Sequence, residues 1–199
     1  MKKIGILLIA LTLSTFIMAQ EKTKVKELGL TFKNLNEFGF SYKVGTTKEL
    51  WRFNALSFSG SNTDAEFNND NADFKRFGFS LKVGKEYRRL VSEKVEFRYG
   101  ADLSFGYRYD KYTGHNTENG YGYEVKENSY SPGINLVLGL NYKINDQFIF
   151  GAEIMPYLNY SISESTTTTD TFGKHKSDYS NFNYGFDSSS VLLSVAYRF

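Results

Sequence analysis

The stretch that decides the fold is Ser189–Phe199, which reads SSVLLSVAYRF. Every second residue in it is large and apolar or aromatic: Val191, Leu193, Val195, Tyr197 and Phe199. Residues at this spacing share one face of a β-strand. A strand with such a face leaves an apolar edge that templates aggregation. A closed barrel removes that edge by pairing the last strand with the first.

Seven earlier stretches alternate in the same way, which makes eight predicted strands. They cover residues 28–33, 38–45, 51–58, 76–84, 95–109, 130–142 and 148–160. The phase slips at Ala55-Leu56, which indicates a β-bulge. Three connections are short or charged, at 46–48, 86–93 and 145–146. Three others are predicted as long polar loops, at 60–72, 111–123 and 163–184. Short turns at one end and long loops at the other are typical of outer-membrane barrels.

Side-chain volume indicates which face points outward. The apolar face carries Phe, Tyr, Leu and Ile, which are too bulky to fill the interior of an eight-stranded barrel from every strand. The other face repeats Gly between charged residues, which suits a narrow polar lumen. Tyr and Trp near the strand ends fit interfacial aromatic belts. The sequence therefore predicts an all-β, eight-stranded antiparallel up-and-down transmembrane β-barrel. A secreted lipocalin-like ligand binder, with the apolar face inside, is the distant alternative.

Charged residues on the polar face need partners in so narrow a lumen. We expect an ion-pair network there, formed by Arg52, Lys82, Glu96, Arg98, Asp102 and Glu153. In one interpretation this network neutralises and plugs the lumen. In the other it lines a narrow porin-like channel for small solutes or ions.

The first residues predict export. Lys2 and Lys3 precede the apolar run Ile4–Ala19, and polar residues follow. This pattern is a secretory signal peptide over 1–19, which leaves 20–199 as the barrel domain. The chain has 24 basic and 22 acidic residues, so removing two lysines leaves 24 − 2 = 22 of each sign. A neutral chain gives no reason to expect nucleic acid as a partner. The lack of cysteine excludes disulfides and a lipid-modified N-terminal Cys.

No catalytic constellation is apparent. The two histidines, His115 and His175, fall in predicted loops, and no strand carries a histidine. The acidic segment at 64–73 lacks the spacing of a calcium-binding loop. We therefore expect neither an enzyme nor a cofactor or metal site.

The signal sequence, the eight strands, the loop asymmetry and the terminal Tyr197-Arg198-Phe199 together resemble the small bacterial outer-membrane β-barrels, the porin-like or OmpA-like group. The resemblance covers about 28–199 and implies a location in the cell outer membrane. It implies contact with membrane lipids and lipopolysaccharide, and assembly by machinery that reads Val195, Tyr197 and Phe199 as a C-terminal signal. No peptidoglycan-binding domain follows the barrel, so we expect no cell-wall tether. A monomer with a structural or surface-interaction role, acting through its long loops on an extracellular partner, is the expected function.

Overall fold

The computed structural model describes residues 24–34, 37–67, 70–116, 122–186 and 191–199, and these are almost entirely β-strand. The strands are β1 (Val25–Asn34), β2 (Glu37–Gly45), β3 (Glu49–Phe67), β4 (Asp70–Leu90), β5 (Val95–Asn116), β6 (Gly122–Lys143), β7 (Phe148–Ile154), β8 (Tyr157–Thr169), β9 (Gly173–Gly185) and β10 (Val191–Arg198). No helix in this part of the chain is long and apolar enough to cross a membrane. The signal peptide predicted over 1–19 lies outside the described residues.

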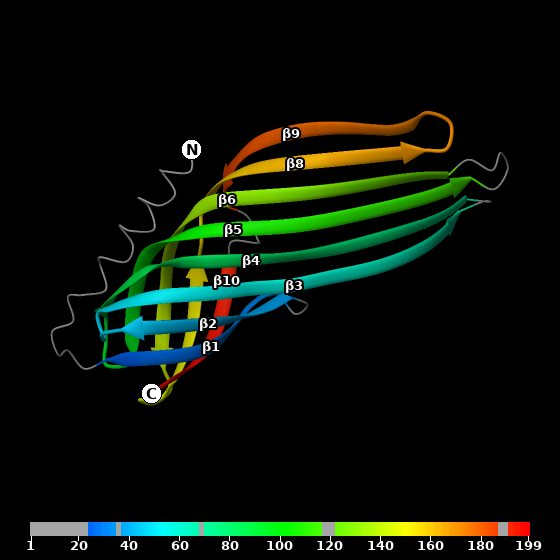
Figure 1. Ribbon diagram of the computed structural model, residues 1–199. Coiled ribbons are helices and arrows are strands. Elements are labelled where there is room, and N and C mark those ends of the chain that lie inside the picture. Colours follow the sequence, from blue (N-terminus) through cyan, green and yellow to red (C-terminus); the bar gives the residue numbers. More distant parts are fainter. Residues whose placement is uncertain (1–23, 35–36, 68–69, 117–121, 187–190) are drawn as a thin grey trace.

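Eight of the strands close into a ring. Consecutive strands from β1 to β7 pair in antiparallel register, and β10 lies between β7 and β1 (Figure 1). At the closing seam Leu28 lies opposite Tyr197. Lys26 and Phe199 exchange backbone hydrogen bonds of 3.1 and 2.9 Å there. The predicted closed eight-stranded barrel is confirmed, with its last strand paired to its first.

The seventh and eighth strands are each divided in two. β7 and β8 are successive parts of the seventh strand, interrupted at Met155-Pro156. Proline has no N–H to donate to a ladder, but its carbonyl still accepts a 2.9 Å hydrogen bond from the Leu136 N–H. The alternation of faces survives the break, because Ile154 and Leu158 both point outward. β9 pairs with β8 above the break, and β10 pairs with β7 below it.

The prediction of long polar loops at 60–72, 111–123 and 163–184 is wrong for most of these residues. Most of each segment continues the flanking strands as a β-hairpin, with β8 and β9 paired from Tyr157–Gly185 to Thr169–Gly173. Ladder hydrogen bonds use backbone groups only, so polar side chains do not prevent pairing. Where neither face meets a core or lipid, the apolar alternation that marks a strand in sequence is lost.

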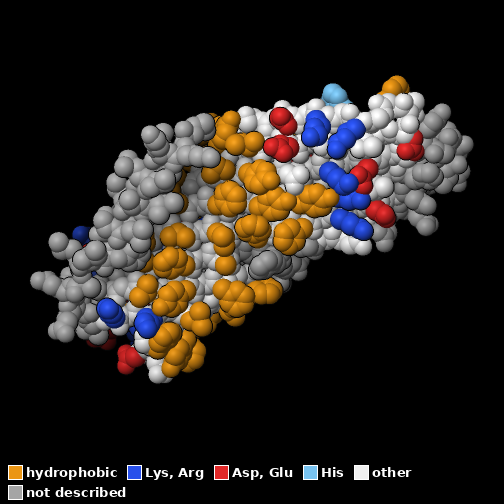
Figure 2. Space-filling model, in the orientation of Figure 1, with side chains coloured by type: hydrophobic (Ala, Val, Ile, Leu, Met, Phe, Trp, Pro, Cys, Tyr) orange, Lys and Arg blue, Asp and Glu red, His pale blue; other side chains and the backbone are white. Residues whose placement is uncertain are grey.

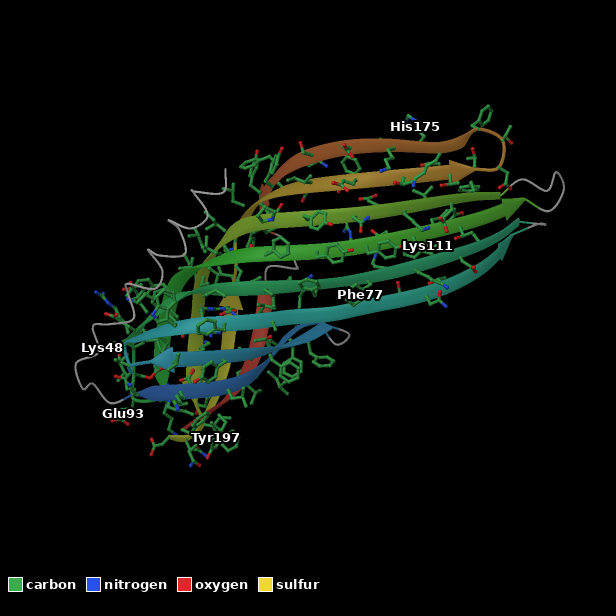
Figure 3. All side chains as sticks on the ribbon, viewed as in Figure 1. Lys48, Phe77, Glu93, Lys111, His175 and Tyr197 are labelled. Atoms are coloured by element: carbon green, nitrogen blue, oxygen red, sulfur yellow. The ribbon has the colours of Figure 1, made fainter. Side chains whose placement is uncertain are left out.

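These hairpins make the barrel wall uneven. β3, β4, β5, β6, β8 and β9 run on past the ends of β1, β2 and β10 as a curved sheet (Figure 1). The short connections lie at the other end, where Figure 3 labels Lys48 and Glu93 far from His175 in β9. The loop asymmetry predicted from sequence is therefore present, with hairpins in place of loops. We call the six-stranded part beyond the ring the sheet extension.

Local irregularities occur where the sequence predicts them. The register between β3 and β4 shifts between Leu56 and Ser59, at the predicted bulge. The β6–β7 turn is held by the Asn145 side chain, whose Oδ1 accepts hydrogen bonds from the N–H groups of Gln147 (2.9 Å) and Phe148 (2.7 Å). The charged connection predicted at 86–93 is shorter than expected, because β4 continues to Leu90.

The outer surface of the barrel is apolar. Figure 2 shows a broad band of hydrophobic side chains over the wall, with charged side chains gathered beyond it on the sheet extension. Exposed members from around the ring include Leu28, Phe40, Phe53, Leu81, Leu103, Leu136, Phe150, Leu193 and Val195. The residues that alternate with these along each strand point inward, and they are buried and mostly polar or charged. This inverts the usual arrangement of a soluble protein and is the arrangement of a barrel that faces lipid.

Candidate functional site

Arg52 on β3 lies at the centre of the charged lumen and is only 1% exposed. Its Nη2 is 2.9 Å from Glu153 Oε1, and its Nη1 is 3.1 Å from Glu86 Oε2. Its Nε lies 3.2 Å from Asp102 Oδ1, an ion pair without hydrogen-bond geometry. These carboxylates come from β7, β4 and β5, so one guanidinium links strands from different sides of the ring.

A second guanidinium, Arg88, holds the end of the lumen that lies near the short turns. Its Nη1 and Nη2 donate to the two Glu27 oxygens at 2.7 Å each, which is the bidentate geometry that suits guanidinium best. Its Nε donates to Glu86 at 2.7 Å. Arg198 on the last strand also donates to Glu27, at 2.9 Å. The seam between β1 and β10 is therefore tied to β4 through charged side chains.

Arg98 fits between these groups because glycine lines the adjacent wall. It lies 3.2 Å from Glu153 and 3.6 Å from Glu86. A Cβ added at Gly139 would come within 2.8 Å of Arg98 Nε, and one at Gly151 within 2.8 Å of Arg98 Nη2. Contacts that short require the guanidinium to move. The repeated glycines on the inner face thus leave the space that the arginines occupy.

Five of the six lumen residues predicted from sequence take part in this network: Arg52, Glu96, Arg98, Asp102 and Glu153. Lys82 departs from that prediction. Within the described part of the chain its Nζ makes no ion-pair contact, and its hydrogen-bond partner is Met155 Sδ at 3.8 Å. Lys82 lies above the network, at the level of Ser104 and Asn54.

Sequence reasoning missed several members of the network: Glu27, Lys43, Glu86, Arg88, Lys143 and Arg198. Glu86 and Arg88 lie on the same inward face of β4 as Lys82 and Gly84. Extending the fourth strand by six residues would have found both. The apolar alternation stops at Val83, which is why a strand end was predicted too early.

Opposite charges in contact fill the lumen at this level. The side chains of Arg52 and Glu86 are at most 1% exposed. Such groups are stable in a low-dielectric interior only when paired and hydrogen-bonded. Chemically the arrangement can neutralise and block the lumen. Among the described residues, no group of three or more His, Cys, Asp or Glu is placed to hold a metal ion.

Within the sheet extension, Glu127 links β6 to the β8–β9 hairpin. It accepts hydrogen bonds from the hydroxyls of Tyr179 and Ser129. Burial alone would raise the pKa of Glu127, but the hydrogen bonds from Tyr179 and Ser129 outweigh it and hold the pKa below its ordinary value. The bond to Glu127 likewise raises the pKa of the Tyr179 phenol.

We expect the β9 strand to loosen in acid. A carboxylate whose folded-state pKa is lowered stabilises the fold above its ordinary pKa, and that stabilisation is lost as the pH falls through the folded value. Amide hydrogen exchange across β9 should therefore speed up, after correction for intrinsic rates, between about pH 5 and about pH 3. Tyr179→Phe should exchange faster at neutral pH and show less of this acid response. An equal response in Tyr179→Phe would contradict the assignment to this hydrogen bond.

Lysines form a row on the outer surface of the sheet extension. Lys75, Lys111 and Lys126 are neighbours in register on β4, β5 and β6, and Lys176 continues the row across Thr166. Figure 3 shows Lys111 further along the extension than Phe77, which belongs to the end of the apolar band. Glu124 pairs with Lys111 at 2.6 Å and with Lys126 at 2.5 Å. The lysine row thus follows the edge of the apolar band.

The three residues predicted as an assembly signal lie on the outer face of β10. Val195, Tyr197 and Phe199 are exposed there. The Tyr197 ring meets Phe148 edge-on at 5.3 Å and stacks on Phe199 at 6.3 Å between centroids. Their accessibility on the closing strand is what a recognised signal requires, and their recognition stays a prediction.

Comparison with known proteins finds similarity at the level of structure. No protein-family model and no curated protein sequence matches the chain. A major outer membrane protein from Thermus thermophilus is 12% identical, with 89% of this chain and 100% of that chain covered and a TM-score of 0.46. The attachment invasion locus protein Ail of Yersinia pestis is 15% identical, with coverages of 90% and 100% and a TM-score of 0.38. Acinetobacter baumannii CarO is 10% identical, with coverages of 90% and 97% and a TM-score of 0.34.

These identities and TM-scores are low, so the assignment rests on the chain itself. Its strands close into an eight-membered ring, its outer wall is apolar, and its lumen is filled by paired charges. That combination is stable where lipid, not water, surrounds the wall. The chain therefore has the architecture of a small transmembrane β-barrel with a filled, charged lumen.

Proposed function

We propose that this protein is an integral, non-enzymatic component of the bacterial outer membrane with a structural or surface-interaction role. The apolar outer wall supports insertion in lipid, and the charged network supports a plugged lumen. The sheet extension faces the outside of the cell and offers its surface to an extracellular partner. The barrel acts as a monomer, because its ring is complete within one chain.

Lipid contacts follow the apolar band and the lysine row. The band meets acyl chains, and the row (Lys75, Lys111, Lys126 and Lys176) lies where phosphate groups of lipopolysaccharide begin. Assembly machinery that reads the exposed residues of β10 inserts the barrel. In this role the barrel holds the protein in the membrane, and the sheet extension contacts the extracellular partner.

The observation that carries the plug is the chain of ion pairs across the lumen. Glu153 on β7 contacts Arg52 on β3, which contacts Glu86 on β4, which contacts Arg88 and through it Glu27 on β1. Eight strands enclose an interior that side chains fill. A conducting path would have to separate these pairs at a large electrostatic cost.

Planar-bilayer recording tests the plug against the channel alternative. We expect purified protein to insert without reproducible conductance steps. The double variant Arg52→Ala with Glu153→Ala removes opposing charges together, leaves fewer unpaired groups than either single change, and should produce measurable steps. Lys75→Ala, on the outer surface, serves as the control and should stay silent. Reproducible wild-type steps that disappear in Arg98→Gln or Glu153→Gln would replace the plug with the porin-like channel.

A further inference from the structure

A polar cavity of about 620 Å³ opens above the charged network, on the side of the sheet extension. This volume lies within the range of roughly 300–1,000 Å³ that is usual for small-molecule sites. Most of its lining residues come from β4, β5, β6, β8 and β9, and Lys33 on β1, Phe38 on β2 and Leu192 on β10 also border it. Because β1, β2 and β10 end at this level, the cavity is open to one side. We call it the cup.

The cup exists because the inner face changes from long charged side chains to short polar ones. Strand register places these short side chains in consecutive rungs around the wall. The lower rung contains Lys82, Ser104, Gly133, Asn159 and Asn183. The next contains Ser80, Gly106, Ser131, Ser161 and Asn181. Five strands thus contribute small hydrogen-bonding groups at the same height, and the volume they do not fill is the cup.

The cup wall keeps hydrogen-bonding capacity after its own contacts are made. Ser129 and Ser163 are 2.7 Å apart at their hydroxyl oxygens, and Ser131 and Ser161 are 2.9 Å apart. Ser129 also donates to Glu127, and Ser161 also accepts from Asn183. Because each hydroxyl can donate once and accept twice, acceptor positions stay open on the wall after these contacts. A ligand with many hydroxyl groups can meet this wall, whereas an apolar ligand would strip its hydration without replacing it.

The floor of the cup holds a cation without a close ion pair and an acceptor without a hydrogen bond among the described residues. The carboxylates of Asp102 and Glu153 attract the cation, Lys82, but neither is in ion-pair contact with it. Among the described residues, Lys82 Nζ has the Met155 thioether as its hydrogen-bond partner, at 3.8 Å, and a thioether is a weak acceptor. Asn135 is 7% exposed, and its Oδ1 has no hydrogen-bond partner. A carboxylate beside Lys82 and a hydroxyl beside Asn135 would satisfy both. By contrast, Arg108 on the wall is paired with Asp110 at 3.1 Å.

We infer that the cup binds a short acidic saccharide, with its hydroxyls on the Ser and Asn rungs and its carboxylate at Lys82. Tyr179 also borders the cup, and an aromatic ring can contact the C–H face of a sugar. The inference goes beyond the structural role proposed above. It depends neither on whether the lumen below conducts nor on which compartment the sheet extension faces.

Titration calorimetry on the full chain in lipid nanodiscs tests the inference. The probes are a trisaccharide of galacturonic acid, the matching neutral galactose trisaccharide, and inorganic phosphate. Lys82→Gln removes the floor cation, and Ser131→Trp fills the cup. Lys48→Gln removes an exposed lysine from the turn between β2 and β3, at the opposite end of the barrel, and is the matched charge control. A heat-dependent gel shift checks that each variant forms the barrel.

We expect the acidic trisaccharide to bind at least about tenfold more tightly than the neutral one, a difference of about 1.4 kcal/mol. Lys82→Gln should abolish that difference, Ser131→Trp should abolish binding of both sugars, and Lys48→Gln should change neither. Three results would overturn the inference: no heat with either sugar at millimolar concentration, unchanged sugar binding in folded Ser131→Trp, or phosphate binding as tightly as the acidic sugar.

Discussion

Arg52→Gln is expected to lower the free energy of unfolding by about 3–5 kcal/mol, the cost of removing one partner from a buried ion pair. Arg52 contacts Glu153, Glu86 and Asp102 inside the lumen. Glutamine keeps some hydrogen bonding but no charge, so three carboxylates lose their shared counter-ion. Denaturant unfolding in detergent micelles, followed by the fluorescence of the single tryptophan, Trp51, measures the loss.

Arg76→Gln is the matched control for Arg52→Gln. Arg76 also pairs with an acid, Asp110 at 2.6 Å, but its side chain is 46% exposed on the sheet extension. Exposed pairs contribute about 0–1 kcal/mol, because water screens them. The two substitutions are chemically identical, and the sites differ in burial and in the acids they contact, three at Arg52 and Asp110 at Arg76. If both variants lose the same stability, burial in the lumen is not what makes the network important.

Leu103→Arg is expected to destabilise the inserted barrel by about 2–4 kcal/mol, the cost of Arg on the lipid face near the middle of a bilayer. Leu103 is 68% exposed, halfway along the apolar alternation of β5. In lipid the guanidinium would have to leave water or thin the bilayer around it. The loss should appear as less protein in the outer-membrane fraction and a lower temperature for the gel shift between unboiled and boiled samples.

Phe172→Arg controls for the introduction of a charge at an exposed apolar position. Phe172 is 90% exposed in the β8–β9 turn, beyond the apolar band. Arg there stays in water, so we expect a change within about 0.5 kcal/mol. A water-soluble barrel with this same outer face would leave both arginines in water and tolerate both substitutions equally. Soluble protein with an unaffected Leu103→Arg variant would therefore contradict the membrane assignment.

Several features of the barrel could be predicted from sequence because they depend only on which residues alternate along each strand. Leu193 and Val195 on one side of β10, with Ser194 and Arg198 on the other, already define an apolar and a polar face, and the structure keeps that division. The bulge near Leu56 was visible as a break in the same alternation. A period of two needs no knowledge of neighbours, only of the pleat.

The extent of the strands could not be predicted in this way. Thr166 and Lys176 lie opposite each other in β8 and β9, although their segments lack the apolar alternation from which the other strands were predicted. Their backbones pair because the hairpin continues the ladder below it, so order spreads from the barrel into a polar segment. Glu86 and Arg88 were missed for a related reason, because β4 continues to Leu90, beyond the end of its apolar alternation.

The sequence by itself determined the architecture: eight alternating strands, an apolar exterior, a charged interior, and long polar connections at one end. Only the tertiary structure decided which charges meet and where space remains. Lys82 and Arg52 have the same inward parity, yet Arg52 is enclosed by carboxylates and Lys82 faces the cup. The physical reason is that parity assigns a side chain to a face, whereas its height in the lumen follows from the register of every strand around the ring.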